Sequence, residues 1–170
     1  MGEAKPFSSK STTHGKEHEL ARKDFATLFK ASHSNVKVKE TGMWVSQQCP
    51  IIATSPDGIV KCDCCGVGAL EIKCPYSDSI LIVEEYARKD TSEFFKVQHK
   101  TVVIVEEGDV VVNIKHPYYT QIQTQLYCCN LPFAYLVVAT KSDCDNLRYF
   151  RVEKDFVFHQ SMITKAKFFF

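Results

Sequence analysis

The chain has 170 residues and a mass of 19.3 kDa, which is typical of one domain. Its 45% hydrophobic and 24% charged residues are ordinary globular usage and argue against a disordered chain. The formal net charge is only +1, so any nucleic-acid site must be a local patch. The apolar runs are too short to span a bilayer, and residues 1–19 contain no apolar signal segment. We therefore expect an intracellular protein, in the nucleus or cytoplasm, that is neither secreted nor inserted in a membrane.

The first third of the chain predicts one helix followed by short extended segments. Apolar residues at helical spacing predict a helix over 12–30, capped by Thr12 or Thr13, with Leu20, Phe25, Leu28 and Phe29 on one face. Residues 31–40 are polar and predict a connection. Extended segments are expected over 43–45 and 51–53, with turns at 47–50 and 55–58.

The remainder alternates between strand and helix patterns. Apolar runs bounded by turn residues predict strands over 59–61, 69–73, 101–105, 110–114, 133–139 and 149–152. The first two of these form one hairpin, and the next two form a second around a Gly-Asp turn. Helical patterns cover residues 79–89, 118–129 and 155–170. The result is a single α+β domain in which helices flank a central mixed β-sheet.

One group of polar residues is suited to hold a metal ion. Asp57 lies on a Pro-Asp-Gly turn before one hairpin strand, and Glu71 and Lys73 share a face of its partner strand. Two carboxylates with the carbonyl of Ile72 between them supply the hard oxygen ligands that Mg²⁺ or Mn²⁺ prefers. A lysine beside the metal can orient an attacking water and stabilise charge on a phosphate. The alternative for Glu71 and Lys73 is an exposed ion pair on the solvent face of a strand.

Three segments in order give the sequence a specific resemblance. They are Ser-Pro-Asp-Gly-Ile-Val from residue 55, Gly-Ala-Leu-Glu-Ile-Lys-Cys-Pro-Tyr from residue 68, and Tyr-Tyr-Thr-Gln-Ile-Gln-Thr-Gln-Leu from residue 118. This pattern resembles the YqaJ-type viral recombinase family, which includes the phage lambda exonuclease and belongs to the PD-(D/E)XK nuclease superfamily. The resemblance implies a restriction-endonuclease-like fold, with a nuclease domain over residues 15–170 after an N-terminal segment of residues 1–14. It also suggests a minimal or truncated family member.

The resemblance implies a role for several residues. Asp57 and Glu71 match the metal-binding carboxylates, Ile72 lends its carbonyl, and Lys73 matches the catalytic lysine. Gln121 and Tyr118 match the Tyr-x-x-Gln-x-Gln helix, whose alternative reading is a solvated polar face. The expected contacts to DNA come from four polar side chains: Ser55, His116, Gln123 and Gln125, although His116 also suits a helix cap.

The family also carries a glutamate on its N-terminal helix, in a Gly-x-x-x-Glu-x-x-Ala pattern. Here Glu19 stands at the expected distance from Gly15, but Ala21 comes one residue early. Glu17 is therefore the second candidate. A solvent-facing glutamate near the start of a helix is the structural alternative for either residue.

The 8 cysteines are expected to be reduced, since the chain has no secretory signal. Cys62 and Cys65 have the CxxC spacing of a zinc site, but no second such pair exists. Buried or inert thiols are thus favoured over structural Zn²⁺ at this hairpin tip. An iron–sulfur cluster is not expected, because superfamily clusters use one cysteine far upstream and three near the C-terminus.

The sequence therefore predicts a Mg²⁺-dependent deoxyribonuclease, an exonuclease that digests DNA from its ends in recombination or viral and mobile-element DNA processing. Family resemblance adds a homo-trimeric ring around DNA and a single-strand annealing protein as partner. Six lysines are candidates to line the central channel of such a ring: Lys61, Lys73, Lys96, Lys100, Lys115 and Lys141. Two alternatives stay open, namely a catalytically inactive nucleic-acid-binding module of the same fold and a zinc-stabilised interaction domain.

Overall fold

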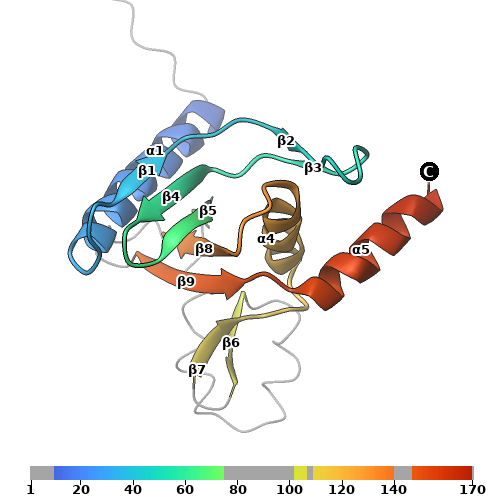
Figure 1. Ribbon diagram of the computed structural model, residues 1–170. Coiled ribbons are helices and arrows are strands. Elements are labelled where there is room, and N and C mark those ends of the chain that lie inside the picture. The colour runs from blue at the N-terminus through green and yellow to red at the C-terminus, as the bar shows by residue number, and fades with distance from the viewer. Residues whose placement is uncertain (1–9, 75–101, 107–108, 140–146, 170) are drawn as a thin grey trace, which may run out of the picture.

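The computed structural model describes residues 10–74, 102–106, 109–139 and 147–169. Five strands form the main sheet in the order β1-β4-β5-β8-β9 (Figure 1). Their bounds are Lys37–Lys39, Gly58–Cys62, Gly66–Lys73, Phe133–Val138 and Arg148–Glu153. Neighbouring strands are antiparallel except β5 and β8, which run parallel with Glu71 opposite Leu136. The predicted mixed sheet is confirmed.

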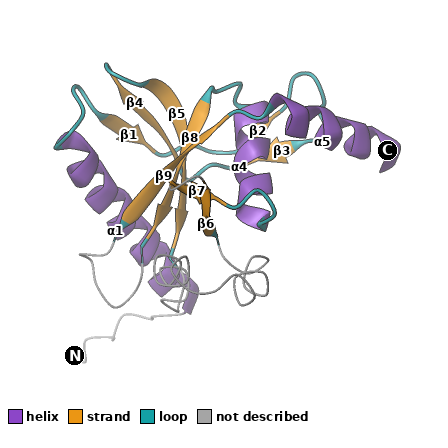
Figure 2. Ribbon diagram, turned by 90° about the horizontal axis from the view of Figure 1, so that it is seen from below, coloured by secondary structure: helices purple, strands orange, loops and turns teal. Residues whose placement is uncertain are grey.

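Two helices cover opposite faces of this sheet (Figure 2). Helix α1 (Lys10–Lys30) buries Ala21, Phe25 and Phe29, one residue per turn, against Leu70 and Ile72 of β5. Leu20 and Leu28 were expected on that face but are 50% and 46% exposed, because the four-residue repeat from Ala21 to Phe29 sets the buried stripe. Thr12 and Thr13 lie within α1, so neither caps it.

Helix α4 (Pro117–Cys128) packs on the other face of the sheet. Its buried Tyr119, Ile122 and Leu126 contact a core to which β5 contributes Ala69 and β8 contributes Leu136. Since side chains alternate along a strand, Glu71 and Lys73 lie on the same face as Ala69. That face is therefore covered by α4.

Smaller elements complete the described chain. Strands β2 (Trp44–Val45) and β3 (Ala53–Thr54) pair with each other, as do β6 (Val103–Glu106) and β7 (Asp109–Val112). Helix α5 (Phe156–Phe169) projects from the sheet, and it ends at the C-terminus in Figure 1. These elements confirm the predicted second hairpin and C-terminal helix, whereas the predicted helix over 79–89 lies outside the described residues.

Two sequence expectations need correction. Residues 31–40 were expected to be a connection, yet they contain β1, whose three residues are too few to show a strand pattern. The strands predicted over 59–61 and 69–73 leave residues 62–68 between them, but Cys62 pairs with Gly66, so only residues 63–65 remain as the hairpin tip. Gly66 has φ +84°, the left-handed conformation that closes this kind of turn.

None of the described helices combines the length and apolar character needed to cross a membrane.

Candidate active site

Asp57 occupies the point where β4 begins and its pairing with β5 stops. Its Oδ2 accepts a hydrogen bond of 2.7 Å from the backbone N–H of Ile72, in effect extending the ladder by one side chain. A guanidinium nitrogen of Arg22 on α1 donates to the Asp57 carbonyl over 3.2 Å. The turn that carries Asp57 is thus held from both the sheet and the helix.

Glu71 and Lys73 form a buried ion pair rather than the exposed pair considered from the sequence. Glu71 is only 2% exposed, and its Oε1 lies 2.5 Å from Lys73 Nζ. The Lys73 ammonium also lies 4.7 Å from the centre of the Tyr118 ring, in a cation–π contact. The sheet face that would ordinarily be solvated is closed by α4, which explains the burial.

Two glutamines of α4 complete the hydrogen bonding of this pair. Gln121 donates from Nε2 to Glu71 Oε1 over 2.6 Å and accepts from Lys73 Nζ at Oε1 over 3.1 Å. Gln125, one turn later, donates to Glu71 Oε2 over 2.5 Å. Gln121 and Gln125, four residues apart on one face of the helix, therefore both point to the Glu71 carboxylate.

Burial and charge shift the protonation of this cluster. Burial raises the pKa of Glu71 and the nearby Asp57 charge raises it further, while Lys73 and Gln125 lower it. Burial, followed by the charge of Lys73, lowers the pKa of His116. His116 is consequently neutral at pH 7, and its Nδ1 accepts from the Tyr118 N–H over 3.2 Å as the N-cap of α4.

The oxygen atoms at this edge suit a hard divalent cation. N–H and C=O of one strand residue point to the same side, and the Ile72 N–H points to Asp57. The Ile72 carbonyl therefore points to the side where β4 has ended, whereas the Lys73 carbonyl is taken by the Ala139 N–H. The Ile72 carbonyl and the carboxylates of Asp57 and Glu71 are together the kind of oxygen ligands that Mg²⁺ or Mn²⁺ binds.

The two candidate glutamates on α1 have different surroundings. Glu19 lies on the outer surface, where Lys23 donates to its Oε1 over 2.7 Å. Glu17 is half-buried. Burial raises the pKa of the Cys74 thiol to about 11, and the negative charges of Glu17 and Asp57 raise it further. Glu17 is thus the glutamate on the Asp57 side of the helix.

Gln123 and Ser55 do not join the cluster. Gln123 is fully buried, donating to the Glu153 carbonyl over 2.8 Å and accepting from the Asp155 N–H over 3.0 Å. Its side chain therefore links α4 to the start of α5. Ser55 is exposed on the loop between β3 and β4.

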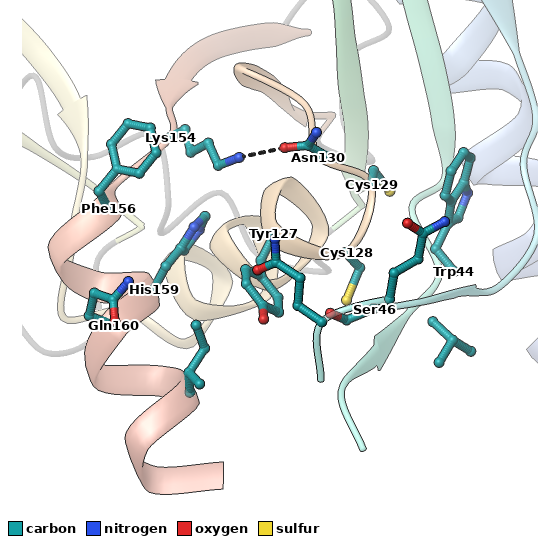
Figure 3. A pocket seen from close by; sticks show the side chains of 14 residues that line it. Trp44, Ser46, Tyr127, Cys128, Cys129, Asn130, Lys154, Phe156, His159 and Gln160 are labelled. Carbon is teal, nitrogen blue, oxygen red and sulfur yellow. Dashed lines mark hydrogen bonds between the residues drawn. The ribbon is translucent and has the colours of Figure 1, made fainter. Parts of the chain in front are cut away.

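A separate pocket of about 570 Å³ lies among α4, α5 and β2 (Figure 3). Trp44, Tyr127 and His159 contribute rings to it, and Lys154 donates to Asn130 over 3.0 Å at its rim. Asp57, Glu71 and Lys73 are not among its lining residues, so it is distinct from the carboxylate cluster.

Sequence reasoning missed two residues. Arg22 carried no signal, because its contact with the Asp57 carbonyl depends on how α1 crosses the sheet. His33 lies within the segment predicted as a polar connection, yet its Nδ1 is 3.0 Å from Cys64 Sγ. This contact lowers the pKa of the Cys64 thiol to about 6. The Cys-x-Cys-Cys run was the available signal, since three clustered thiols invite a search for a fourth ligand.

A carboxylate pair, a strand lysine and two helix glutamines on a mixed sheet between helices define a restriction-endonuclease-like nuclease fold. Residues 1–132 match the YqaJ-like viral recombinase domain, and the chain belongs to that family. The family and the fold predicted from the sequence are confirmed.

Solved structures agree with this assignment. The chain resembles the crystal structure of LHK-Exo in complex with dAMP, with a TM-score of 0.59 and 20% identity over 95% of this chain and 67% of that one. It also resembles the alkaline exonuclease LHK-Exo from Laribacter hongkongensis, with a TM-score of 0.55 and 16% identity over 96% and 80%. Among curated protein sequences there is no match.

Proposed function

We propose that the chain is a Mg²⁺-dependent DNA exonuclease, with Mn²⁺ as an alternative ion. The observation that carries the proposal is the single hydrogen-bonded network that joins Glu71, Lys73 and Gln121 beside Asp57. A structural ion pair needs no second carboxylate next to it. Family membership and the fold of an alkaline exonuclease support the same conclusion.

Each residue of the cluster would have a separate role in the cleavage of DNA. Asp57, Glu71 and the Ile72 carbonyl would hold the cation, which lowers the pKa of water and neutralises phosphate charge when it is bound. Lys73 would hold the attacking water and stabilise negative charge on the phosphate. Gln121 would fix the ammonium of Lys73, and Tyr118 would support it from the ring face.

The substrate we propose is linear duplex DNA, entered from an end. Ser55, His116 and Lys115 would lie nearest the strand. Gln125 is fully buried against Glu71, so we do not assign it a contact with DNA. A homo-trimeric ring and a single-strand annealing partner, acting inside the cell, are further proposals that rest on the family.

The test is digestion of end-labelled linear duplex DNA with Mg²⁺, beside a circular duplex. We expect loss of the linear DNA only, and a Lys73→Ala variant at least about 10²-fold slower, which corresponds to about 2.7 kcal/mol of transition-state stabilisation. Lys23→Ala is the matched control, because Lys23 is a 69% exposed lysine on the outer surface of α1.

Other outcomes would redirect the proposal. Cleavage of the circles as well would retain a nuclease but remove the requirement for ends. DNA binding without metal-dependent cleavage would favour an inactive nucleic-acid-binding module instead.

A further inference from the structure

Four metal-binding side chains gather at the tip of the β4–β5 hairpin, at the opposite end of β5 from Glu71 and Lys73. They are His33, Cys62, Cys64 and Cys65, and their ligand atoms all lie within 4.8 Å of one another. The three cysteines come from the hairpin, and the histidine comes from the loop between α1 and β1. Two segments about 30 residues apart in sequence therefore meet at one point.

The spacing of these atoms is that of a tetrahedral zinc site. Zinc–sulfur and zinc–nitrogen bonds at tetrahedral angles place neighbouring ligand atoms about 3.6–3.8 Å apart. His33 Nδ1 lies 3.0, 3.4 and 3.9 Å from the sulfurs of Cys64, Cys65 and Cys62. Cys64 Sγ lies 3.5 Å from Cys62 Sγ and 3.8 Å from Cys65 Sγ.

Disulfide bonds do not account for the cluster. A disulfide brings two sulfurs to about 2.05 Å, whereas these sulfurs stay at 3.5 and 3.8 Å, and all three cysteines are free. Unligated thiols packed this closely would gain little, because a thiol is a weak hydrogen-bond donor and acceptor.

Surrounding contacts hold the four ligands in place. The Cys65 N–H donates to Cys62 Sγ over 3.3 Å, which fixes the position of that sulfur within the tip. The His33 ring stacks on Phe29, with 3.7 Å between centroids and 12° between planes. The Asp63 N–H donates to the Ser34 carbonyl over 3.1 Å, which joins the loop to the hairpin tip without the help of a metal.

We propose that His33, Cys62, Cys64 and Cys65 bind one structural Zn²⁺ ion. The four protein ligands fill a tetrahedral shell and leave no open position, as in structural rather than catalytic zinc sites. Binding releases the thiol protons to solvent, so the site carries three thiolates and one neutral imidazole. The ion would fasten the end of α1 to the hairpin whose other end carries the candidate active site.

The first measurement is the zinc content of the full chain, purified with a phosphine reductant and without chelator. We expect about one zinc per chain, and at least about tenfold weaker retention against a competing chelator in His33→Ala and Cys64→Ser. Cys129→Ser is the matched control, since Cys129 lies at the end of α4, and it should retain the ion. His33→Cys should also retain zinc, because it supplies a fourth thiolate.

Cobalt replacement keeps the proposal testable if a variant fails to fold. Co²⁺ added to the metal-free wild-type chain should give the visible bands of a tetrahedral site and thiolate-to-cobalt charge transfer. Three results would overturn the proposal: a wild-type chain without zinc or a cobalt–thiolate signal, equal zinc retention in His33→Ala, or a disulfide among the three cysteines detected by intact mass.

Discussion

At the scale of single residues, three glutamines of α4 separate into two kinds. Gln121 and Gln125 serve the Glu71 carboxylate, whereas Gln123, fully buried, joins the backbone at Glu153 and Asp155. Replacing Gln121 should therefore affect catalysis, and replacing Gln123 should affect stability.

We expect Gln121→Ala to lower the rate of DNA digestion about 10- to 100-fold with an almost unchanged melting temperature. Gln123→Ala should instead cost about 1–3 kcal/mol of unfolding free energy, because it leaves the part-buried Glu153 carbonyl and Asp155 N–H without this partner. Urea unfolding and initial rates on linear duplex DNA distinguish the two. A Gln123→Ala chain of normal stability with a large rate defect would contradict this division.

The two glutamates of α1 give a second residue-scale prediction. Glu17 is half-buried on the Asp57 side, and Glu19 is paired with Lys23 on the surface. Glu17→Gln should therefore slow DNA cleavage more than Glu19→Gln, measured at the same Mg²⁺ concentration. If Glu19→Gln proves the more damaging, the family's helix glutamate corresponds to Glu19 as its spacing from Gly15 suggests.

The sequence predicted most of this cluster because the chemistry is local. Asp57 on its turn and Glu71 with Lys73 on one strand face needed only the period of a strand. The burial of Glu71 could not be predicted in the same way, since it depends on α4 packing from about 50 residues further along the chain. His33 escaped notice for the same reason, because its partners lie 29–32 residues away.

At the scale of elements, α5 depends on the residue that precedes it. Asp155 caps the helix by accepting from the Phe158 N–H over 2.9 Å, and it also accepts from the Tyr119 hydroxyl over 2.9 Å. The Phe158 N–H, followed by the Tyr119 hydroxyl, holds the pKa of Asp155 below its usual range. Since the folded-state pKa is the lower one, the carboxylate stabilises the fold above its unfolded pKa, and this contribution is lost as pH falls through the folded pKa.

We expect Asp155→Ala to lose about 1 kcal/mol of unfolding free energy at neutral pH. Asp155→Asn, which retains one capping oxygen but not the charge, should be less stable than the wild type at pH 7 and should lose less stability between about pH 5 and pH 3. Thermal unfolding at a series of pH values measures both effects. Parallel pH profiles for the wild type and Asp155→Asn would show that this carboxylate contributes no charge-dependent stability.

The described helices and strands β8 and β9 were predicted within two residues, whereas the start of β5 and the short strand β1 were not. The helix over 118–129 and the strand over 133–139 follow from periodicity and continuous apolar runs, and the structure places them within one residue. Strand β1 shows only one half-buried side chain, Val38, between two exposed lysines. It is a strand because it pairs with β4, and such pairing cannot be predicted from the pattern of three residues.

At the scale of the whole molecule, the match to the family ends before the sheet is complete. The matched segment stops at residue 132, yet β8 begins at Phe133 and lies between β5 and β9. All six β8 residues are buried. The matched segment therefore lacks an interior strand that contributes to both hydrophobic cores.

A fragment of residues 1–132 should thus fail to fold, whereas the full chain folds. Circular dichroism and thermal unfolding of both chains test this, with the full chain as reference. A cooperative unfolding transition for the fragment would show that β8 and the elements after it are dispensable.

The parallel pairing of β5 with β8 also determines when the cluster around Glu71 can assemble during synthesis. Two parallel neighbours need a long crossover, here residues 74–132, and this crossover carries Gln121 and Gln125 to the face of Glu71. Such distant contacts close slowly, after the local hairpins have formed. A ribosome adds only about 5–20 residues per second, so β5 emerges well before the strand that fixes it. The growing chain therefore displays Glu71 and Lys73 before the α4 residues that surround them have been added, and the proposed catalytic network cannot assemble until β8 has left the ribosome.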